Sequence, residues 1–213
     1  MQSARILLAD DHPLVLQGLQ KLLEGEGFNV VATAENGRDL LEVAQRHRPD
    51  VIILDISMPL LNGMAAARQL KKLLPQCKLI FLTMHADATY AREAFDAGGS
   101  GYLLKRSAAS ELKEAIMMVL KGRRYLTPLI PHDDFILSET SSGKSLKLGS
   151  LTLRQREVLQ LLAEGHSVKE IASALNISVK TVEFHKARVM DQLGIHTTAA
   201  LTKYAMNHGL AAR

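Results

Sequence analysis

The chain has 213 residues, 47% of them hydrophobic and 23% charged, so we expect one large or two smaller packed domains rather than a disordered protein. A single cysteine, Cys77, the lack of a signal-peptide pattern and the lack of any apolar run near the roughly 18 residues of a membrane helix predict a cytoplasmic protein without a membrane segment. The formal net charge is +4, and residues 151–213 carry 8 Lys and Arg against 5 Asp and Glu, which is a weak indication of nucleic-acid binding.

Residues 1–121 alternate short apolar runs with segments of helical periodicity. The apolar runs predict five strands, at residues 6–9, 29–33, 51–54, 79–82 and 102–104. Helices are predicted at residues 13–25, 37–48, 63–73 and 88–97, and from Ser107 or Ser110 to Gly122. This alternation predicts an α/β domain in which helices cover both faces of a parallel sheet.

The stretch from Val51 to Leu54 is an unbroken apolar run that ends directly at Asp55. A run without polar alternation is typical of a strand that is buried on both faces of a parallel sheet. In open α/β sheets, ligands bind outside the carboxyl ends of the strands, so Asp55 is placed where chemistry is expected.

Polar residues also end other predicted strands: Asp10 and Asp11, Thr83, and Lys105. Each residue alone is also explained as a turn residue, a helix cap or a surface side chain, but all of them with Asp55 would share one sheet edge. Three carboxylates there would repel one another without a cation, and hard oxygen ligands favour Mg²⁺ over Zn²⁺. Lys105 adds a positive charge and Thr83 a hydroxyl, so the set suits a phosphoryl group on a carboxylate nucleophile.

Residues 122–149 are rich in Pro, Ser and Asp and predict a polar linker. From residue 151 the pattern is wholly helical. Four helices are predicted, from Thr152 to Gly165, from Ser167 to Leu175, over residues 179–193, and from Thr197 or Thr198 to Met206. The second and third have helix–turn–helix proportions, although a helical bundle with a solvated basic face explains the charges equally well.

The first 121 residues resemble the receiver domain of two-component response regulators. The resemblance rests on Asp10-Asp11, Asp55 with Met58-Pro59 and Asn62-Gly63 behind it, Thr83, and the run from Tyr102 to Lys105. It implies a flavodoxin-like, five-stranded fold whose strand order, 2-1-3-4-5, is the family's own.

The receiver resemblance also implies roles for single residues. Asp55 would accept a phosphoryl group from a sensor histidine kinase. Lys105 would contact the phosphoryl oxygens, and Thr83 and Tyr102 would form the switch pair. The ligands implied for Mg²⁺ are the carboxylates of Asp10, Asp11 and Asp55 and the backbone carbonyl of Ser57.

The C-terminal residues resemble the LuxR-type DNA-binding domain, and with the receiver they indicate the NarL/FixJ class. The matching residues are 151–159, Gly165, 169–172, Leu175, Ile177-Ser178, Thr181-Val182 and His185. The resemblance implies an all-α, four-helix domain that reads DNA with its third helix and dimerises through its last. The candidate DNA contacts are Lys169, Lys180, Thr181, Glu183, Phe184, His185, Lys186 and Arg188. Glu183 stands where the family often has Lys, so it would face a cytosine amino group or point away.

We therefore predict a receiver domain at residues 1–121, a linker at 122–149 and a DNA-binding domain at 150–213. Phosphorylation of Asp55 would control homodimerisation and binding to paired half-sites in promoters, with RNA polymerase as a further partner. We also expect the receiver to cover the DNA-binding domain when unphosphorylated. Two alternatives are a phosphohydrolase with an aspartate nucleophile, although position 57 is Ser and offers no second acid, and a protein-binding adaptor.

Overall fold

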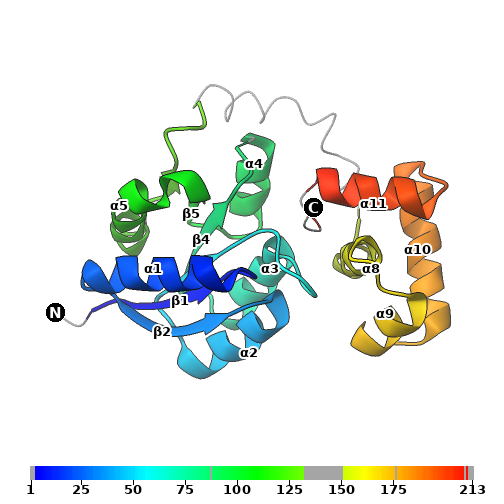
Figure 1. Ribbon diagram of the computed structural model, residues 1–213, viewed down its shortest axis with the longest axis horizontal. Helices are drawn as coiled ribbons and strands as arrows, with labels where there is room; N and C mark the ends of the chain where they lie inside the picture. The colour runs from blue at the N-terminus through cyan, green and yellow to red at the C-terminus, as the bar shows by residue number, and fades with distance from the viewer. Residues whose placement is uncertain (1–2, 87, 132–150, 176, 209, 211–213) are drawn as a thin grey trace.

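The computed structural model describes residues 3–86, 88–131, 151–175, 177–208 and 210. The strands are β1 (Arg5–Ala9), β2 (Asn29–Ala34), β3 (Val51–Leu54), β4 (Lys78–Thr83), β5 (Gly101–Leu104) and β6 (Tyr125–Leu126). The helices among them are α1 (Pro13–Gly25), α2 (Gly37–His47), α3 (Gly63–Leu73), α4 (Ala88–Asp96) and α5 (Ala108–Leu120). The C-terminal helices are α8 (Leu153–Ala163), α9 (Val168–Leu175), α10 (Val179–Leu193) and α11 (Thr198–Asn207), and they lie beside the sheet domain (Figure 1).

The sheet is parallel throughout, with strand order β2-β1-β3-β4-β5-β6. The order of the first five strands confirms the prediction, but the sheet has six strands rather than the predicted five. The sixth strand, β6, lies within the segment predicted to be linker. It is two residues long, which is too short for a periodicity signal, and its place depends on tertiary contacts such as the 3.0 Å hydrogen bond from Thr127 N to Tyr102 O.

Side-chain alternation along the strands builds a separate core on each face of the sheet. In β3, Val51 and Ile53 pack with α1 and α5, whereas Ile52 and Leu54 pack with α2, α3 and α4. All four residues of this strand are buried, which confirms the prediction from the unbroken apolar run.

The C-terminal helices pack around a third core, and their ends follow the predicted capping residues. Thr152 and Gln155 form a reciprocal capping box at the start of α8. Ser178 caps α10 through Thr181 N, and Gly194 closes that helix with φ 66°. No helix in the described part of the chain is long and apolar enough to cross a membrane.

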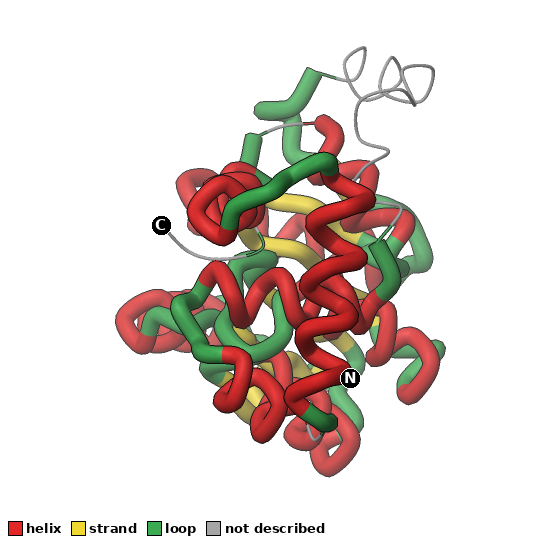
Figure 2. The backbone as a smooth tube through the Cα atoms, turned by 90° about the vertical axis from the view of Figure 1, so that its right-hand side faces the viewer, coloured by secondary structure: helices red, strands yellow, loops and turns green. Residues whose placement is uncertain are grey.

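The two parts of the chain are in contact. The C-terminal part contributes α8 and the end of α11, and the sheet domain contributes the β3–α3 loop and α4. Leu60 in that loop packs against the core of the C-terminal helices. Tyr90 Oη on α4 donates a 3.0 Å hydrogen bond to Asn207 O on α11. In Figure 2 the C-terminal helices stand in front of the strands.

Candidate functional site

A buried ion-pair cluster occupies the carboxyl edge of the sheet. Asp10 follows β1 and Asp55 follows β3, and because these strands are neighbours their carboxylates converge. Lys105, directly after β5, places Nζ 2.6 Å from Asp10 Oδ2 and 2.9 Å from Asp55 Oδ2. Both aspartates are buried, at 2% and 5% exposure. The structure thus brings together three of the residues that the sequence singled out at separate strand ends.

The charge of Lys105 is held firmly in this cluster. Burial by itself lowers the pKa of Lys105, but the charge of Asp55 and the hydrogen bonds to Asp10 and Asp55 outweigh it, so the pKa is raised above its ordinary value. The ammonium group therefore stays protonated at neutral pH and offsets part of the carboxylate charge.

The second part of the cluster is suited to a cation. One ligand atom from each of Asp10, Asp11 and His12 lies within 4.8 Å of the others. Asp11 Oδ1 is buried and has no hydrogen-bond partner, although His12 Nδ1 lies 2.8 Å away, outside hydrogen-bonding geometry. A buried carboxylate oxygen that lacks a donor fits a metal-binding role. The acidic cluster of Asp10 and Asp11 is therefore consistent with a metal site.

Thr83 and Tyr102, the predicted switch pair, are joined through the backbone of His85. Thr83 Oγ1 accepts a 3.3 Å hydrogen bond from His85 N, and Tyr102 Oη donates a 2.8 Å hydrogen bond to His85 O. Thr83 and Tyr102 are both buried. The ring of His85 also stacks on Tyr90 with a centroid distance of 4.4 Å, so these residues connect the sheet edge to α4.

The loop behind Asp55 is held by the C-terminal helices. Gln160 on α8 donates from Nε2 to Met58 O at 2.6 Å and accepts at Oε1 from Asn62 N at 2.8 Å. Ser57, whose carbonyl is implied as a metal ligand, is half-buried and lies directly before this clamped segment. Gln160 was not predicted as a site residue, although a polar residue within the apolar run Leu159-Gln160-Leu161-Leu162 indicates a buried hydrogen-bonding role.

His12, His85 and Tyr90 were also missed. His12 directly follows Asp10-Asp11 in the sequence, and this position could have identified it as part of the acidic cluster. His85 and Tyr90 carry no comparable sequence signal, because their roles arise from contacts that only the tertiary structure creates.

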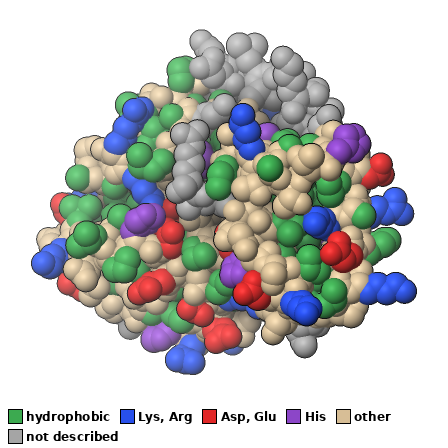
Figure 3. Space-filling model, turned by 45° about the vertical axis from the view of Figure 1, so that its right-hand side comes forward, with side chains coloured by type: hydrophobic (Ala, Val, Ile, Leu, Met, Phe, Trp, Pro, Cys, Tyr) green, Lys and Arg blue, Asp and Glu red, His purple; other side chains and the backbone are tan. Residues whose placement is uncertain are grey.

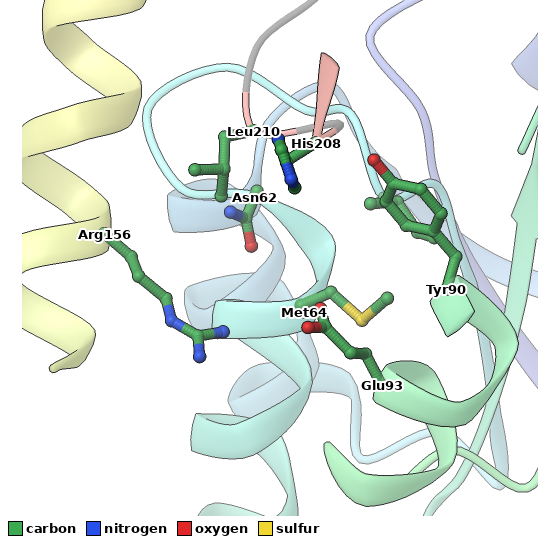
Figure 4. A pocket seen from close by; sticks show the side chains of 8 residues that line it. Asn62, Met64, Tyr90, Glu93, Arg156, His208 and Leu210 are labelled. Atoms are coloured by element: carbon green, nitrogen blue, oxygen red, sulfur yellow. The ribbon is translucent and has the colours of Figure 1, made fainter. Parts of the chain in front are cut away.

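A small pocket marks the same domain contact. Arg156 reaches from α8 toward α3, while Tyr90 and Glu93 approach from α4 (Figure 4). Burial, with the charge of Arg68 added, lowers the pKa of Arg156. The cavity is about 10 Å³, which is room for at most about one water molecule, so it is a packing feature and not a ligand site.

The candidate DNA contacts gather on the exposed side of α10. Val182, Val189 and Leu193 are buried, so helical periodicity turns Lys180 and Phe184 outward. The outward residues also include Glu183 and Arg188, whereas Thr181, His185 and Lys186 are half-buried. Lys169 is exposed but lies on α9, whereas the rest of the set lies on α10. Phe184 is 57% exposed, and the guanidinium of Arg188 lies 5.6 Å from its ring.

The structure differs from the expectation that the receiver covers the DNA-binding domain. The receiver contacts α8 and the end of α11, while α10 lies on the far side and keeps its polar face exposed (Figure 1). The buried residues of α10 pack against α8 and α9, so the opposite face of α10 points away from that core. Positive and negative side chains are interspersed on the surface shown in Figure 3, so this face carries no single large basic patch.

Both parts of the chain match known families. The family of response regulator receiver domains matches residues 6–117, and the luxR family of bacterial regulatory proteins matches residues 149–205. The chain is 36% identical over 212 residues to the transcriptional regulatory protein MctR of Rhizobium johnstonii, a match that covers 98% of this chain and 96% of that protein. It is 34% identical over 207 residues to the response regulator UvrY of Escherichia coli K12, covering 96% and 94%.

Solved structures of the response regulator RcsB from Salmonella typhimurium are similar over nearly the whole chain. One has a TM-score of 0.68 at 31% identity and covers 97% of this chain and 98% of that one. RcsB bound to promoter rprA with the phosphomimetic BeF3- has a TM-score of 0.65 at 32% identity, covering 95% and 98%. The chain therefore belongs to the two-component response regulators of the NarL/FixJ family and is a DNA-binding regulator of transcription, not an enzyme.

Proposed function

We propose that Asp55 is the phosphoacceptor and that a sensor histidine kinase supplies the phosphoryl group. The observation that carries this proposal is the Lys105 ammonium, which lies within 3 Å of both Asp10 and Asp55 at the carboxyl edge of the sheet. A fixed cation at this place stabilises the charge that develops on the transferring phosphoryl oxygens. Thr83 supplies a hydroxyl for the same oxygens and shifts the His85 backbone when it moves.

The acidic residues at this edge suit a divalent cation with hard oxygen ligands, and we propose Mg²⁺. The carboxylates of Asp10, Asp11 and Asp55 and the backbone carbonyl of Ser57 would hold the ion, which when bound neutralises phosphoryl charge. Asp11 Oδ1, which is buried and accepts no hydrogen bond, supports this assignment.

On the output side, we propose that α10 enters the major groove and that two copies of the chain bind paired half-sites in promoters, where RNA polymerase is a further partner. The support is the exposed face of α10, with Lys180 and Arg188 for phosphates and Phe184 and Glu183 toward base edges. RcsB has been solved as two dimers bound to two parallel DNAs. Phosphorylation of Asp55 would favour the dimer by changing the contact between the receiver and the C-terminal helices.

The proposal is tested by incubating the chain with acetyl phosphate and Mg²⁺ and separating the phosphorylated form on an affinity gel. We expect a stable phosphorylated species in the wild type and in Asp96→Asn, which alters an exposed residue of α4, and none in Asp55→Asn. Labelling that persists in Asp55→Asn would contradict the assignment. Rapid multiple turnover of the phosphodonor would favour a phosphohydrolase instead.

A further inference from the structure

Gln160 makes two hydrogen bonds to the receiver, one at each end of the segment from Met58 to Asn62. Its side chain is 1% exposed, so the amide is removed from water and depends on these partners. The Nε2 group bonds to Met58 O and the Oε1 atom to Asn62 N, and Nε2 also donates to Glu164 Oε1 at 2.7 Å. A single side chain of the DNA-binding domain therefore holds both ends of the Met58–Asn62 segment of the β3–α3 loop.

Leu60, at the centre of this loop, is held in place by the same domain. Its φ is 65°, a left-handed conformation that a Leu residue adopts where its surroundings impose it. The side chain packs against the core of the C-terminal helices, and the Leu60 backbone interacts with the Glu164 carboxylate. Contacts with the C-terminal domain thus hold the loop in this conformation while the two domains are docked.

The clamped loop is continuous with the candidate phosphorylation site. Asp55 Oδ1 accepts a 2.7 Å hydrogen bond from Ile56 N, and Ile56 O accepts a 2.8 Å hydrogen bond from Gly63 N. Ser57 lies between this pair of bonds and Met58, so a displacement of Met58 O moves the Ser57 carbonyl as well. The position of this carbonyl sets how well the acidic site receives a cation.

We propose that Gln160 is a positioning residue for the phosphorylation site: from the DNA-binding domain, it pre-organises the Met58–Asn62 loop and thereby strengthens cation binding beside Asp55. This inference rests on the proposed function of Asp55. Pre-organisation raises affinity because the loop does not have to be ordered when the ion binds. Coupling between two binding events is reciprocal, so an ion bound at the acidic site also stabilises the docking of α8.

The test is a titration of the full-length chain with Mg²⁺ by isothermal calorimetry, and with Mn²⁺ by electron paramagnetic resonance, since the chain has no Trp to report binding by fluorescence. Gln160→Met keeps the side-chain length and removes all three hydrogen bonds, the two to the loop and the one to Glu164. We expect about three- to tenfold weaker Mg²⁺ binding, below the effect of losing a direct partner of a metal ligand. The control is Gln45→Met, which alters an exposed residue of α2 and leaves the affinity unchanged.

Phosphorylation kinetics separate positioning from general damage. In Gln160→Met the Mg²⁺ concentration that gives half-maximal phosphorylation by acetyl phosphate rises by the same factor, while the rate at saturating Mg²⁺ stays at the wild-type value. A lower maximal rate with unchanged Mg²⁺ dependence would overturn the proposal. Wild-type Mg²⁺ affinity in a folded Gln160→Met would overturn it as well.

A second variant tests the route. Leu60→Ala leaves the Gln160 side chain intact and weakens docking, so it lowers Mg²⁺ affinity in the same direction. The double variant, Leu60→Ala with Gln160→Met, is expected to bind Mg²⁺ no more weakly than the more affected single variant, since both substitutions act through one loop. If the losses of Mg²⁺ affinity in the two single variants added up fully in the double variant, the two residues would not act through the same loop. The two proposals can fail separately. If Gln160→Met binds Mg²⁺ more weakly than wild type but the wild-type chain takes up no phosphoryl group, the proposed function is refuted and the positioning role of Gln160 stands.

Discussion

Tyr90 on α4 and Asn207 at the end of α11 are joined by a 3.0 Å hydrogen bond between the Tyr90 hydroxyl and the Asn207 carbonyl. The Tyr90 ring stacks on His85, whose backbone is bonded to both Thr83 and Tyr102. The helix implied in dimerisation is therefore connected by successive contacts to the residues implied in switching. A shift of the His85 backbone changes the support of the Tyr90 ring and, through it, the contact with α11.

Tyr90→Phe is predicted to loosen the contact between the two domains. The exposed hydrogen bond contributes about 0.5–1 kcal/mol, so the population of separated domains rises by about two- to fivefold. Small-angle X-ray scattering detects this as a larger radius of gyration. Tyr125→Phe is the matched control, because it removes a hydrogen bond to Glu111 within the receiver. Equal radii for the two variants would contradict the prediction.

Lys105→Met is predicted to destabilise the chain in EDTA and to make it depend on Mg²⁺. Loss of the ammonium leaves Asp10 and Asp55 buried without their cation, at a cost of about 2 kcal/mol, and Mg²⁺ recovers most of it. Thermal unfolding with EDTA and with Mg²⁺ measures the difference. Lys72→Met, at an exposed position of α3, serves as the control. A Lys105→Met variant with the same Mg²⁺ response as wild type would rule out the charge-balancing role.

Glu164 is predicted to make the stability of the docked chain increase as the pH falls. Burial raises the pKa of Glu164, and the hydrogen bond from Gln160 opposes this only in part. Between the unfolded pKa of about 4.3 and the raised folded value, the folded chain binds more protons, so stability is lost as the pH rises through the folded pKa.

Glu164→Gln removes this titration while keeping an oxygen that accepts from Gln160. The melting temperature of the variant is expected to exceed that of wild type most at pH 7.5, and the gap is expected to narrow as the pH approaches 5. Comparing the two proteins cancels the titration of other groups. A gap that stays constant or widens toward pH 5 would show that the carboxylate is not the titrating group.

Arg188→Ala and Phe184→Ala are predicted to weaken DNA binding in different ways. Loss of a phosphate contact at Arg188 weakens binding to all sequences and reduces the slope of log affinity against log salt by about 1. Loss of Phe184 removes an apolar contact to bases, so preferred sites lose about 1 kcal/mol while the salt slope is unchanged. Fluorescence anisotropy on selected and random duplexes over a salt series measures both quantities. The same salt slope for the two variants would refute this division of roles.

The sequence alone determined most of the architecture and the placement of Asp10, Asp55 and Lys105 at one edge of the sheet. Unbroken apolar runs such as Val51 to Leu54 identify buried parallel strands, because two covered faces leave no place for polar alternation. Parallel strands end at a common edge, so Asp10, Asp55 and Lys105 could be assigned to one site before any coordinates. Local capping chemistry at Thr152 and Ser178 likewise located the helix starts.

Only the tertiary structure decided the sixth strand, the His85 link and the way the two domains meet. Strand β6 is held by pairing with β5, and two residues carry no period of their own. Gln160 and Met58 are separated by 102 positions in the chain, and nothing local to either residue specifies the other. Contacts of this kind arise when two finished surfaces pack, which is why the exposed position of α10 contradicted the expectation of a covered recognition helix. Residues at the strand ends place Asp10, Asp55 and Lys105 together, whereas the contact between α8 and the loop behind Asp55 exists only because the two domains pack against each other.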